Sequence, residues 1–498
     1  MTSAAVPRSP ADGFRSVARA SGIYYVSHAL LVVAGVISMP ITTRLLSREQ
    51  YGLLSLAFAT IAVLTLVAGL GLGSAAMRLY HDARRKGSQA LRHACEGWIT
   101  AALAGSGTAA TMLVIVVTST TDVAADPYAQ CLVAGSGLMV VRAVTSVVAQ
   151  IDRARERAGI HAATLVGVRY ATLIAVILSL WFGPRLAVTV LAASIAVEAA
   201  ALAVRLRSLQ RAGLFTRPRL PRELDLALRY GLPLAAAGSA RFLLAYGDRF
   251  VIERFHGLDA VARYTVPCDL LGKLGELVAV PMQLAAVPVL FRLWSESGAD
   301  ATSRAASQTL ATTASLLVPV AVLYALFAED LVVTVASAKY AGAGELTPYI
   351  LPGIIFSCCN FVVVAGMTIR KRTVQVARNV AVAALINVLL NFLLVPSGGL
   401  AGAGLATSLA WLVLIVANAR GALDTLQLAF PWRPIGRAFV AVLTPVAAAA
   451  ALGALDPASP VALVATVGGL AGATLALLLL LDPSLRVILR SLWPGRLA

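Results

Sequence analysis

The stretch VALVATVGGLAGATLALLLLL, residues 461–481, contains no charged side chain. A helix rises about 1.5 Å per residue, so a run of about 20 apolar residues can cross the hydrocarbon core of a bilayer. Thirteen similar runs precede this one, and charge clusters or Pro/Gly turns separate them. The fourteen predicted spans are 21–43, 52–77, 97–118, 128–150, 161–182, 186–204, 230–247, 264–288, 306–327, 346–368, 379–396, 400–419, 438–455 and 461–481.

The composition agrees with these runs. Of 498 residues, 59% are hydrophobic and 13% are charged, against about 25% charged in ordinary soluble domains. This balance excludes a cytosolic enzyme, a disordered chain and a fibrous repeat. The sequence therefore predicts an all-α integral membrane protein with about 14 transmembrane helices. The five cysteines show no metal-ligand spacing, so we interpret them as packing residues and predict no metal site.

The distribution of basic residues predicts the orientation of the chain. With the N-terminus inside, 30 of the 41 Lys and Arg residues fall on inner segments, seven fall on outer segments and four lie within spans. Cytoplasmic loops carry such an excess of basic residues. The net charge of +17 is therefore explained by topology, and no nucleic-acid partner is expected. Both termini are predicted to be cytoplasmic.

The loops are short, which limits the chemistry that they can perform. No loop could hold a catalytic domain, and no G-x-x-x-x-G-K-[ST] nucleotide motif occurs. The glycine runs 69–73 and 398–404 lie in or beside apolar helices and follow no strand, which favours helix packing or a hinge over nucleotide binding. We therefore predict that the chain is not an enzyme and needs no cofactor. The apolar piece 331–338 is too short to cross and is expected at the interface.

A weak internal repeat predicts the domain organisation. Spans 5 and 6 share their plan with spans 11 and 12, and spans 1 and 2 resemble spans 7 and 8. This pattern predicts two six-helix lobes around a central cavity, with the substrate site between them. The expected divisions are an N-terminal lobe over 1–226, a C-terminal lobe over 227–420, and two extra helices with a cytoplasmic tail over 421–498.

Ionisable side chains within spans usually face a protein interior or a watery cavity. Seven occur here: Arg142, Arg169, Glu198, Arg241, Asp269, Lys273 and Glu276. Helical rise places Lys273 near the midplane, Arg241 slightly past it, and Arg142 and Arg169 in the inner half. Asp269, Lys273 and Glu276 share one helical face, and Arg241 and Asp248 are also expected to share a face.

Several cations at membrane depth suit a diphosphate, because guanidinium groups bind phosphate oxygens in pairs. We therefore predict Arg241, Lys273, Arg142 and Arg169 as substrate-binding residues. Asp269, Glu276, Asp248 and Glu198 are candidates for coupling to H+ or Na+. The alternative is that Asp269 and Lys273 form an internal ion pair while the arginines extend toward the interface.

Several motifs resemble the polysaccharide (oligosaccharide) flippase family of the multidrug/oligosaccharidyl-lipid/polysaccharide exporter superfamily. They are Thr43-Arg-Leu-Leu-Ser-Arg-Glu-Gln-Tyr-Gly52, Gly69-Leu-Gly-Leu-Gly-Ser74, Tyr230-Gly-Leu-Pro233 with Asp248-Arg249, Phe255-His-Gly257 to Tyr264, and the segment from Asn387 through Asn391 and Pro396 to Gly404. Their order covers residues 20–480.

The resemblance implies a flippase that moves undecaprenyl-diphosphate-linked oligosaccharide from the inner to the outer leaflet by alternating access. It also implies an ion gradient as the energy source, a bacterial cytoplasmic membrane, and glycosyltransferases and a polymerase or ligase as partners. The alternatives are a cation-coupled multidrug exporter of the same superfamily, a membrane polymerase or ligase, and a scaffold that transports nothing.

Overall fold

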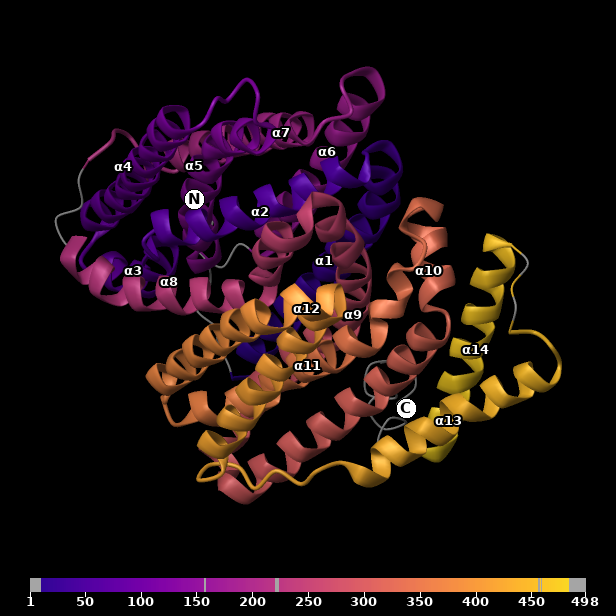
Figure 1. Ribbon diagram of the computed structural model, residues 1–498. Helices are drawn as coiled ribbons and strands as arrows, with labels where there is room; N and C mark the ends of the chain where they lie inside the picture. The colour runs from indigo at the N-terminus through magenta and orange to yellow at the C-terminus, as the bar shows by residue number, and fades with distance from the viewer. Residues whose placement is uncertain (1–9, 156–157, 220–223, 456, 458, 483–498) are drawn as a thin grey trace. The chain divides into compact units, whose positions relative to one another are not determined.

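The computed structural model describes residues 10–155, 158–219, 224–455, 457 and 459–482 (Figure 1). All regular secondary structure in these residues is helical, which confirms the predicted all-α class. Eleven helical segments of the described chain are long and apolar enough to cross a membrane. Leu224–Leu326 contains three predicted spans, Thr373–Ala422 contains two, and Arg48–Arg85 contains one that is broken. The count of fourteen therefore stays a prediction.

The chain divides into two compact units, Met1–Ala262 and Arg263–Ala498. The first unit contains α1 (Pro10–Leu45), α2 (Arg48–Ala68), α3 (Leu72–Arg85), α4 (Ser88–Thr120), α5 (Pro127–Ala154), α6 (Ala158–Phe182), α7 (Ala187–Arg211), α8 (Leu224–Tyr246) and the start of α9 (Asp248–Leu326). The second contains the rest of α9, α10 (Ala328–Val335), the 3-10 turns η1 (Ala338–Tyr340) and η2 (Ala343–Leu346), α11 (Thr347–Ile369), α12 (Thr373–Ala422), α13 (Trp432–Ala451) and α14 (Pro460–Leu481). The predicted lobe boundaries remain a proposal.

The two longest helices are interrupted at glycines. A straight 79-residue α9 would be roughly 120 Å long, but Gly257 and Gly298 in it have φ of +78° and +79°. In α12, Gly399 has φ 56° and ψ −140°. Glycine adopts positive φ at little cost, so each helix can change direction there. Gly298 and Gly399 each fall between two predicted spans, which therefore form separate arms.

Helix α5 is the packing centre of the first unit, where it contacts α2, α3, α4 and α7 (Figure 1). Its buried face carries Leu138, Val144, Val147 and Ile151, each at most 2% exposed. Burial on this scale is unusual for a lipid-facing helix, because such a helix keeps much of its surface outside the protein. Side chains of α5 are thus directed toward neighbouring helices.

The predicted span 52–77 contains a break, which lies at the glycine run where helix packing or a hinge was predicted. The chain breaks between α2 and α3, where Leu70 and Gly71 have φ of +52° and +66°. The break allows a backbone contact with α8, because a Cβ on Gly231 would lie 2.6 Å from the Leu70 carbonyl oxygen. A Cβ on Gly71 would likewise overlap the Gly231 carbonyl. The glycine run 69–73 therefore serves helix packing.

The other end of α2 makes a similar contact with the first turns of α9. A Cβ on Gly52 would overlap the Leu258 carbonyl oxygen, and Arg48 forms an ion pair with Asp259 at 2.7 Å. One end of the broken second span is thus fixed at Gly231, at the start of the seventh predicted span. The other end is fixed at Leu258 and Asp259, just before the eighth.

The long segment between α7 and α8 is anchored at Glu96, near the start of α4. The Glu96 side chain is 1% exposed. Its Oε1 accepts hydrogen bonds from the Thr216 hydroxyl and, at 2.9 Å, from the Thr216 N–H. Nearby, the Arg219 N–H donates to the Thr100 hydroxyl at 3.1 Å. A buried carboxylate thus holds the described part of this segment.

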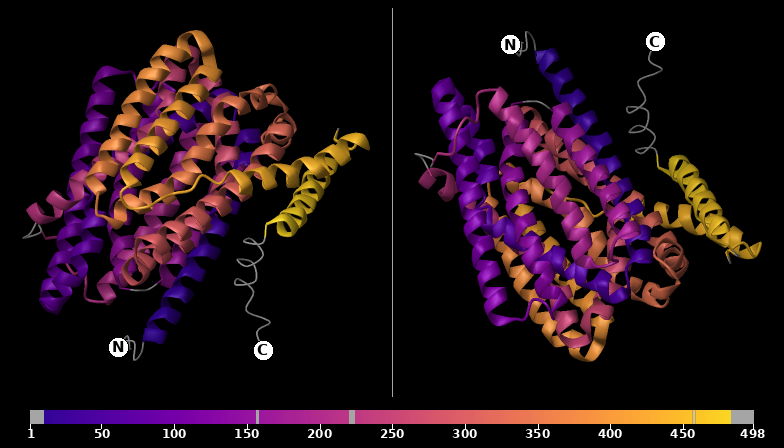
Figure 2. Two further views of the ribbon diagram at one scale, coloured as in Figure 1. Left: turned by 90° about the horizontal axis from the view of Figure 1, so that it is seen from below. Right: turned by 90° about the horizontal axis from the view of Figure 1, so that it is seen from above.

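In the second unit, α11 packs along α12, and α13 and α14 form a hairpin (Figure 2). The hairpin packs on the end of α9 through Val442, Leu463 and Leu470 against Leu323 and Phe327. The short apolar piece predicted at 331–338 overlaps the eight-residue α10, which confirms that it is too short to cross.

Replacing Gly231 with Ala should destabilise the first unit, because the new methyl group meets backbone atoms that cannot rotate away. Overpacking of this kind costs about 1–3 kcal/mol. Thermal unfolding of the purified protein in detergent measures the effect as a lower midpoint. Gly238→Ala on the same helix is the control, since the nearest atom to its Cβ is 3.8 Å away. Equal midpoints for the two variants would contradict the close backbone contact.

Replacing Glu96 with Gln should loosen the segment that it anchors, because the charge-assisted hydrogen bonds weaken by about 1 kcal/mol or more. Limited trypsin digestion then cleaves after Arg219 about fivefold faster or more. Cleavage after Arg211, at the end of α7, is the internal reference. An unchanged ratio of the two cleavage rates would show that Glu96 does not hold the segment.

Candidate functional site

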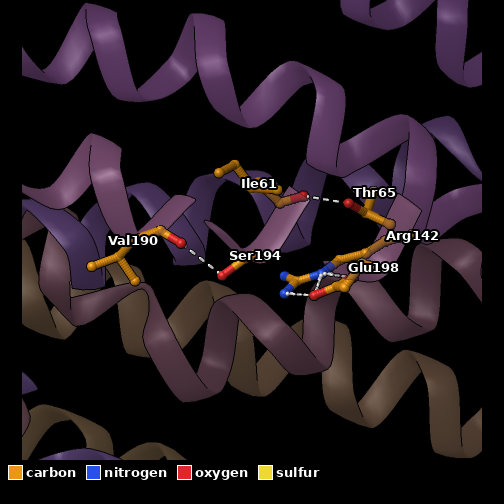
Figure 3. Close-up of polar contacts among 6 residues, drawn as sticks. All are labelled: Ile61, Thr65, Arg142, Val190, Ser194 and Glu198. Atoms are coloured by element: carbon orange, nitrogen blue, oxygen red, sulfur yellow. Dashed lines mark hydrogen bonds and ion pairs between the residues drawn. The ribbon is translucent and has the colours of Figure 1, made fainter. Parts of the chain in front are cut away.

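Three helices of the first unit bring three of the predicted residues together. Arg142 on α5 binds Glu198 on α7 through two nitrogen atoms: Nη2 lies 2.7 Å from Oε1, and Nε lies 3.0 Å from Oε2 (Figure 3). Paired contacts of this kind fix the geometry of a guanidinium and strengthen its hydrogen bonds. The pair exists because α5 packs directly on α7.

Arg169 on α6 is the third member. It interacts electrostatically with both side chains, repelled by Arg142 and attracted by Glu198. The inner charge cluster, as we call Arg142, Arg169 and Glu198, thus contains two guanidinium groups and one carboxylate. One positive charge is left without a partner inside the cluster. All three residues fall in the inner half of their predicted spans, as the helical rise indicates.

The inner charge cluster is partly accessible. The side chains of Arg142 and Glu198 are 32% and 17% exposed, and the Arg142 guanidinium lies 5.5 Å from the Phe58 ring centroid. The neutral hydroxyls drawn in Figure 3 are used elsewhere: Ser194 donates to the Val190 carbonyl at 2.8 Å, and Thr65 donates to the Ile61 carbonyl at 2.7 Å. Such hydrogen bonds satisfy a hydroxyl within its own helix. The groups of this cluster that can bind a ligand are therefore the charged ones.

The other two predicted cations lie in different units. Arg241 is exposed on α8, and Lys273 is half-buried on α9. No carboxylate among the described residues lies within ion-pair distance of either side chain. The alternative Asp269–Lys273 ion pair is therefore not formed in the described chain. Both cations remain available to an anionic ligand.

One of the predicted acidic residues, Asp248, differs from expectation in its position. Asp248 was expected on the face of Arg241, which is wrong, because α8 ends at Tyr246 and Asp248 begins α9. Asp248 is 3% exposed, and its Oδ1 accepts from the Arg249 N–H at 2.8 Å. Glu276 is exposed and Asp269 half-buried on α9. A role for these carboxylates in ion coupling stays a prediction.

Two amides of α12 that the sequence analysis quoted only as part of a family motif, without a role in the site, are buried. Asn387 and Asn391 are 0% exposed. Asn387 donates to the Thr407 hydroxyl at 3.1 Å, and Asn391 donates to the Asn387 carbonyl at 2.8 Å. Within the described chain their Oδ1 atoms have no hydrogen-bond partner. Amide oxygens can accept from water or bind a hard cation. The signal in the sequence was two amides four residues apart in an apolar run.

A carboxylate holds the segment between α10 and α11. Glu329 accepts hydrogen bonds from the Gly342 N–H at 2.7 Å and the Gly344 N–H at 3.0 Å, so its carboxylate holds the turns η1 and η2. The part of the chain that the structure describes has no group of three or more His, Cys, Asp or Glu side chains that could hold a metal ion.

A multi-pass helical bundle with charged residues at membrane depth defines a polytopic membrane protein. Residues 17–294 match the family "Polysaccharide biosynthesis protein". This match covers more than half of the 498 residues, and the chain belongs to that family. Among curated protein sequences, none matches this chain.

Solved structures share the fold at low sequence identity. A structure titled as the lipid II flippase MurJ in an inward closed conformation aligns with a TM-score of 0.71 and 12% identity, and covers 94% of this chain and 98% of its own. An inward-facing multidrug resistance MATE family transporter of the MOP superfamily aligns with a TM-score of 0.61 and 15% identity over 80% and 93% of the two chains. An outward-facing MATE structure aligns at 0.53 and 15% over 85% and 96%.

The inner charge cluster predicts unequal effects of two substitutions. Glu198→Leu leaves two guanidinium groups without a counter-ion, whereas Arg142→Leu leaves Arg169 and Glu198, which can still compensate each other. Arg142 is 32% exposed and Arg169 is exposed, so water screens part of the uncompensated charge and its cost is about 1 kcal/mol. Thermal midpoints in detergent should therefore fall further for Glu198→Leu. A larger loss for Arg142→Leu would show that Arg169 does not share Glu198.

Proposed function

We propose that this protein is a flippase that moves a lipid-linked oligosaccharide diphosphate, of the undecaprenyl type, from the inner to the outer leaflet. The inner charge cluster carries the proposal, since two guanidinium groups face one carboxylate at membrane depth. Charges at this depth are costly and are usually functional. An anionic headgroup would neutralise the excess positive charge of the cluster.

The chemistry of the cations fits a diphosphate. A guanidinium binds two phosphate oxygens at once, while an ammonium acts as a point charge. Arg142 and Arg169 bind the headgroup in the inner half of the membrane, and Arg241 and Lys273 supply further cations along its route. Several weak sites suit transport better than one tight site, because the ligand must also leave.

Transport proceeds by alternating access, in which the binding site opens first to the inner side and then to the outer side. The polyprenyl tail stays in lipid, and no covalent bond is made or broken. An H+ or Na+ gradient drives the cycle. Asp269, Glu276, Asp248 and Glu198 are the titratable candidates for coupling, and the unpartnered oxygens of Asn387 and Asn391 offer a place for Na+.

The cellular setting follows from the same proposal. The protein resides in a bacterial cytoplasmic membrane with both termini inside, in two six-helix lobes with an additional C-terminal helix pair. Glycosyltransferases that build the sugar on the inner side, and a polymerase or ligase on the outer side, act before and after it.

The test is a flipping assay in proteoliposomes that contain undecaprenyl diphosphate carrying a labelled oligosaccharide. The wild-type protein should move the label between leaflets, and Arg142→Gln or Arg169→Gln should slow it by about 10–100-fold, because each loses a charged hydrogen bond of about 1.5–3 kcal/mol. Arg84→Gln/Arg85→Gln is the control, since both arginines are exposed at the end of α3. The control should flip at the wild-type rate.

Two outcomes would overturn the proposal. If the wild-type protein moves no label under any ion gradient, the flippase function fails. Export of cationic dyes by the same vesicles would then favour the multidrug exporter. If flipping occurs but the inner-cluster and control variants are equally active, the cationic site is wrong.

A further inference from the structure

The position of Glu198 on Arg142 has a consequence for substrate binding. Arg142 offers phosphate a paired edge through Nε and Nη2, and both of these atoms are already bound to the Glu198 carboxylate at 3.0 and 2.7 Å. A phosphate group presents two oxygens with much the same spacing as a carboxylate. The two anions therefore compete for one edge of one guanidinium.

From this geometry we propose that Glu198 is an internal competitor, a counter-ion that the phosphate of the substrate must displace from Arg142 on binding and that displaces the phosphate again on release. The inference rests on the proposed function and adds to it a residue that tunes how tightly the substrate is held. The inference does not require Glu198 to couple transport to H+ or Na+.

The surroundings of Glu198 fit an exchange. The Glu198 side chain is 17% exposed. When the carboxylate leaves Arg142, hydration by water therefore compensates little of the lost ion pair. Arg169 attracts it electrostatically, so a second guanidinium offsets part of the charge of a carboxylate displaced from Arg142. The Ser194 hydroxyl, one turn earlier on α7, is bonded to its own helix. The carboxylate thus has one guanidinium to leave and another that attracts it.

Competition also explains how a doubly charged headgroup can be released. Without Glu198, two guanidinium groups would hold a diphosphate with four or more charged hydrogen bonds, and dissociation would be slow. With Glu198 in place, each step toward release is accompanied by re-formation of the paired contact with Arg142. The net affinity is the difference between two similar interactions.

The opposite interpretation is that Glu198 is a positioning residue, which merely holds the Arg142 guanidinium in the correct orientation. The two interpretations predict opposite signs. Removal of a competitor tightens substrate binding, whereas removal of a positioning residue weakens it. The sign of the affinity change therefore decides between them.

The experiment measures binding of undecaprenyl diphosphate to the full-length protein in detergent, together with flipping of the labelled oligosaccharide lipid in proteoliposomes. Glu198→Gln keeps the size of the side chain and removes its charge. We expect its affinity to rise about tenfold or more, which corresponds to about 1.4 kcal/mol, while the flipping rate falls because release is slower.

Glu198→Asp provides a second variant in case Glu198→Gln does not fold. It keeps the charge on a shorter side chain that cannot reach both nitrogen atoms, so its affinity should lie between those of the wild type and Glu198→Gln. Asp152→Asn is the matched control: Asp152 lies on α5 and pairs with Arg205 at 3.1 Å, and its loss should leave affinity unchanged.

An affinity for Glu198→Gln equal to or below that of the wild type would overturn the inference. If the wild type nevertheless flips the labelled lipid normally, the proposed function stands and only the role of Glu198 is wrong. Failure of the wild type to bind undecaprenyl diphosphate would instead count against the proposed function. The two failures are therefore distinguishable.

Discussion

In hydrocarbon no water satisfies an open backbone N–H or C=O group, and the rest of this structure depends on that constraint. The described chain meets it with helices throughout. Within its long helical segments the chain is interrupted at glycines with positive φ, such as Gly71, Gly257, Gly298 and Gly399. The same residues lack a Cβ, so at Gly71 the turn also brings two backbones together.

The helical class and most spans could be predicted from apolar runs, since a run of that length has few alternatives. At the glycine run 69–73 the sequence predicted helix packing or a hinge, but Leu70 and its neighbours are as apolar as a continuous span, so the end of α2 at Ala68 could not be predicted. The motifs that carried the family resemblance prove to contact each other. Gly52 meets Leu258, just after the Phe255–Gly257 motif, and Gly71 meets Gly231. Their glycines permit these approaches, which the sequence by itself does not pair.

The candidate site, like the fold, could be predicted from the sequence only in part. The sequence could single out Arg142, Arg169 and Glu198 as ionisable residues within apolar runs. Their association could not be predicted, since it depends on α7 packing against α5 and α6. The failure at Asp248 has a local cause: α8 ends at Tyr246, and a seven-residue spacing predicts a common face only within one uninterrupted helix.

The anchoring of the segment after α7 at Glu96 sets a limit on movement. Its described residues reach Arg219, whose N–H is bonded to Thr100 on α4, and α8 begins five residues later at Leu224. A fully extended chain covers at most about 3.6 Å per residue, so the start of α8 can move no farther than roughly 18 Å from that anchor. The segment is therefore long in sequence but short as a tether between α4 and the start of α8.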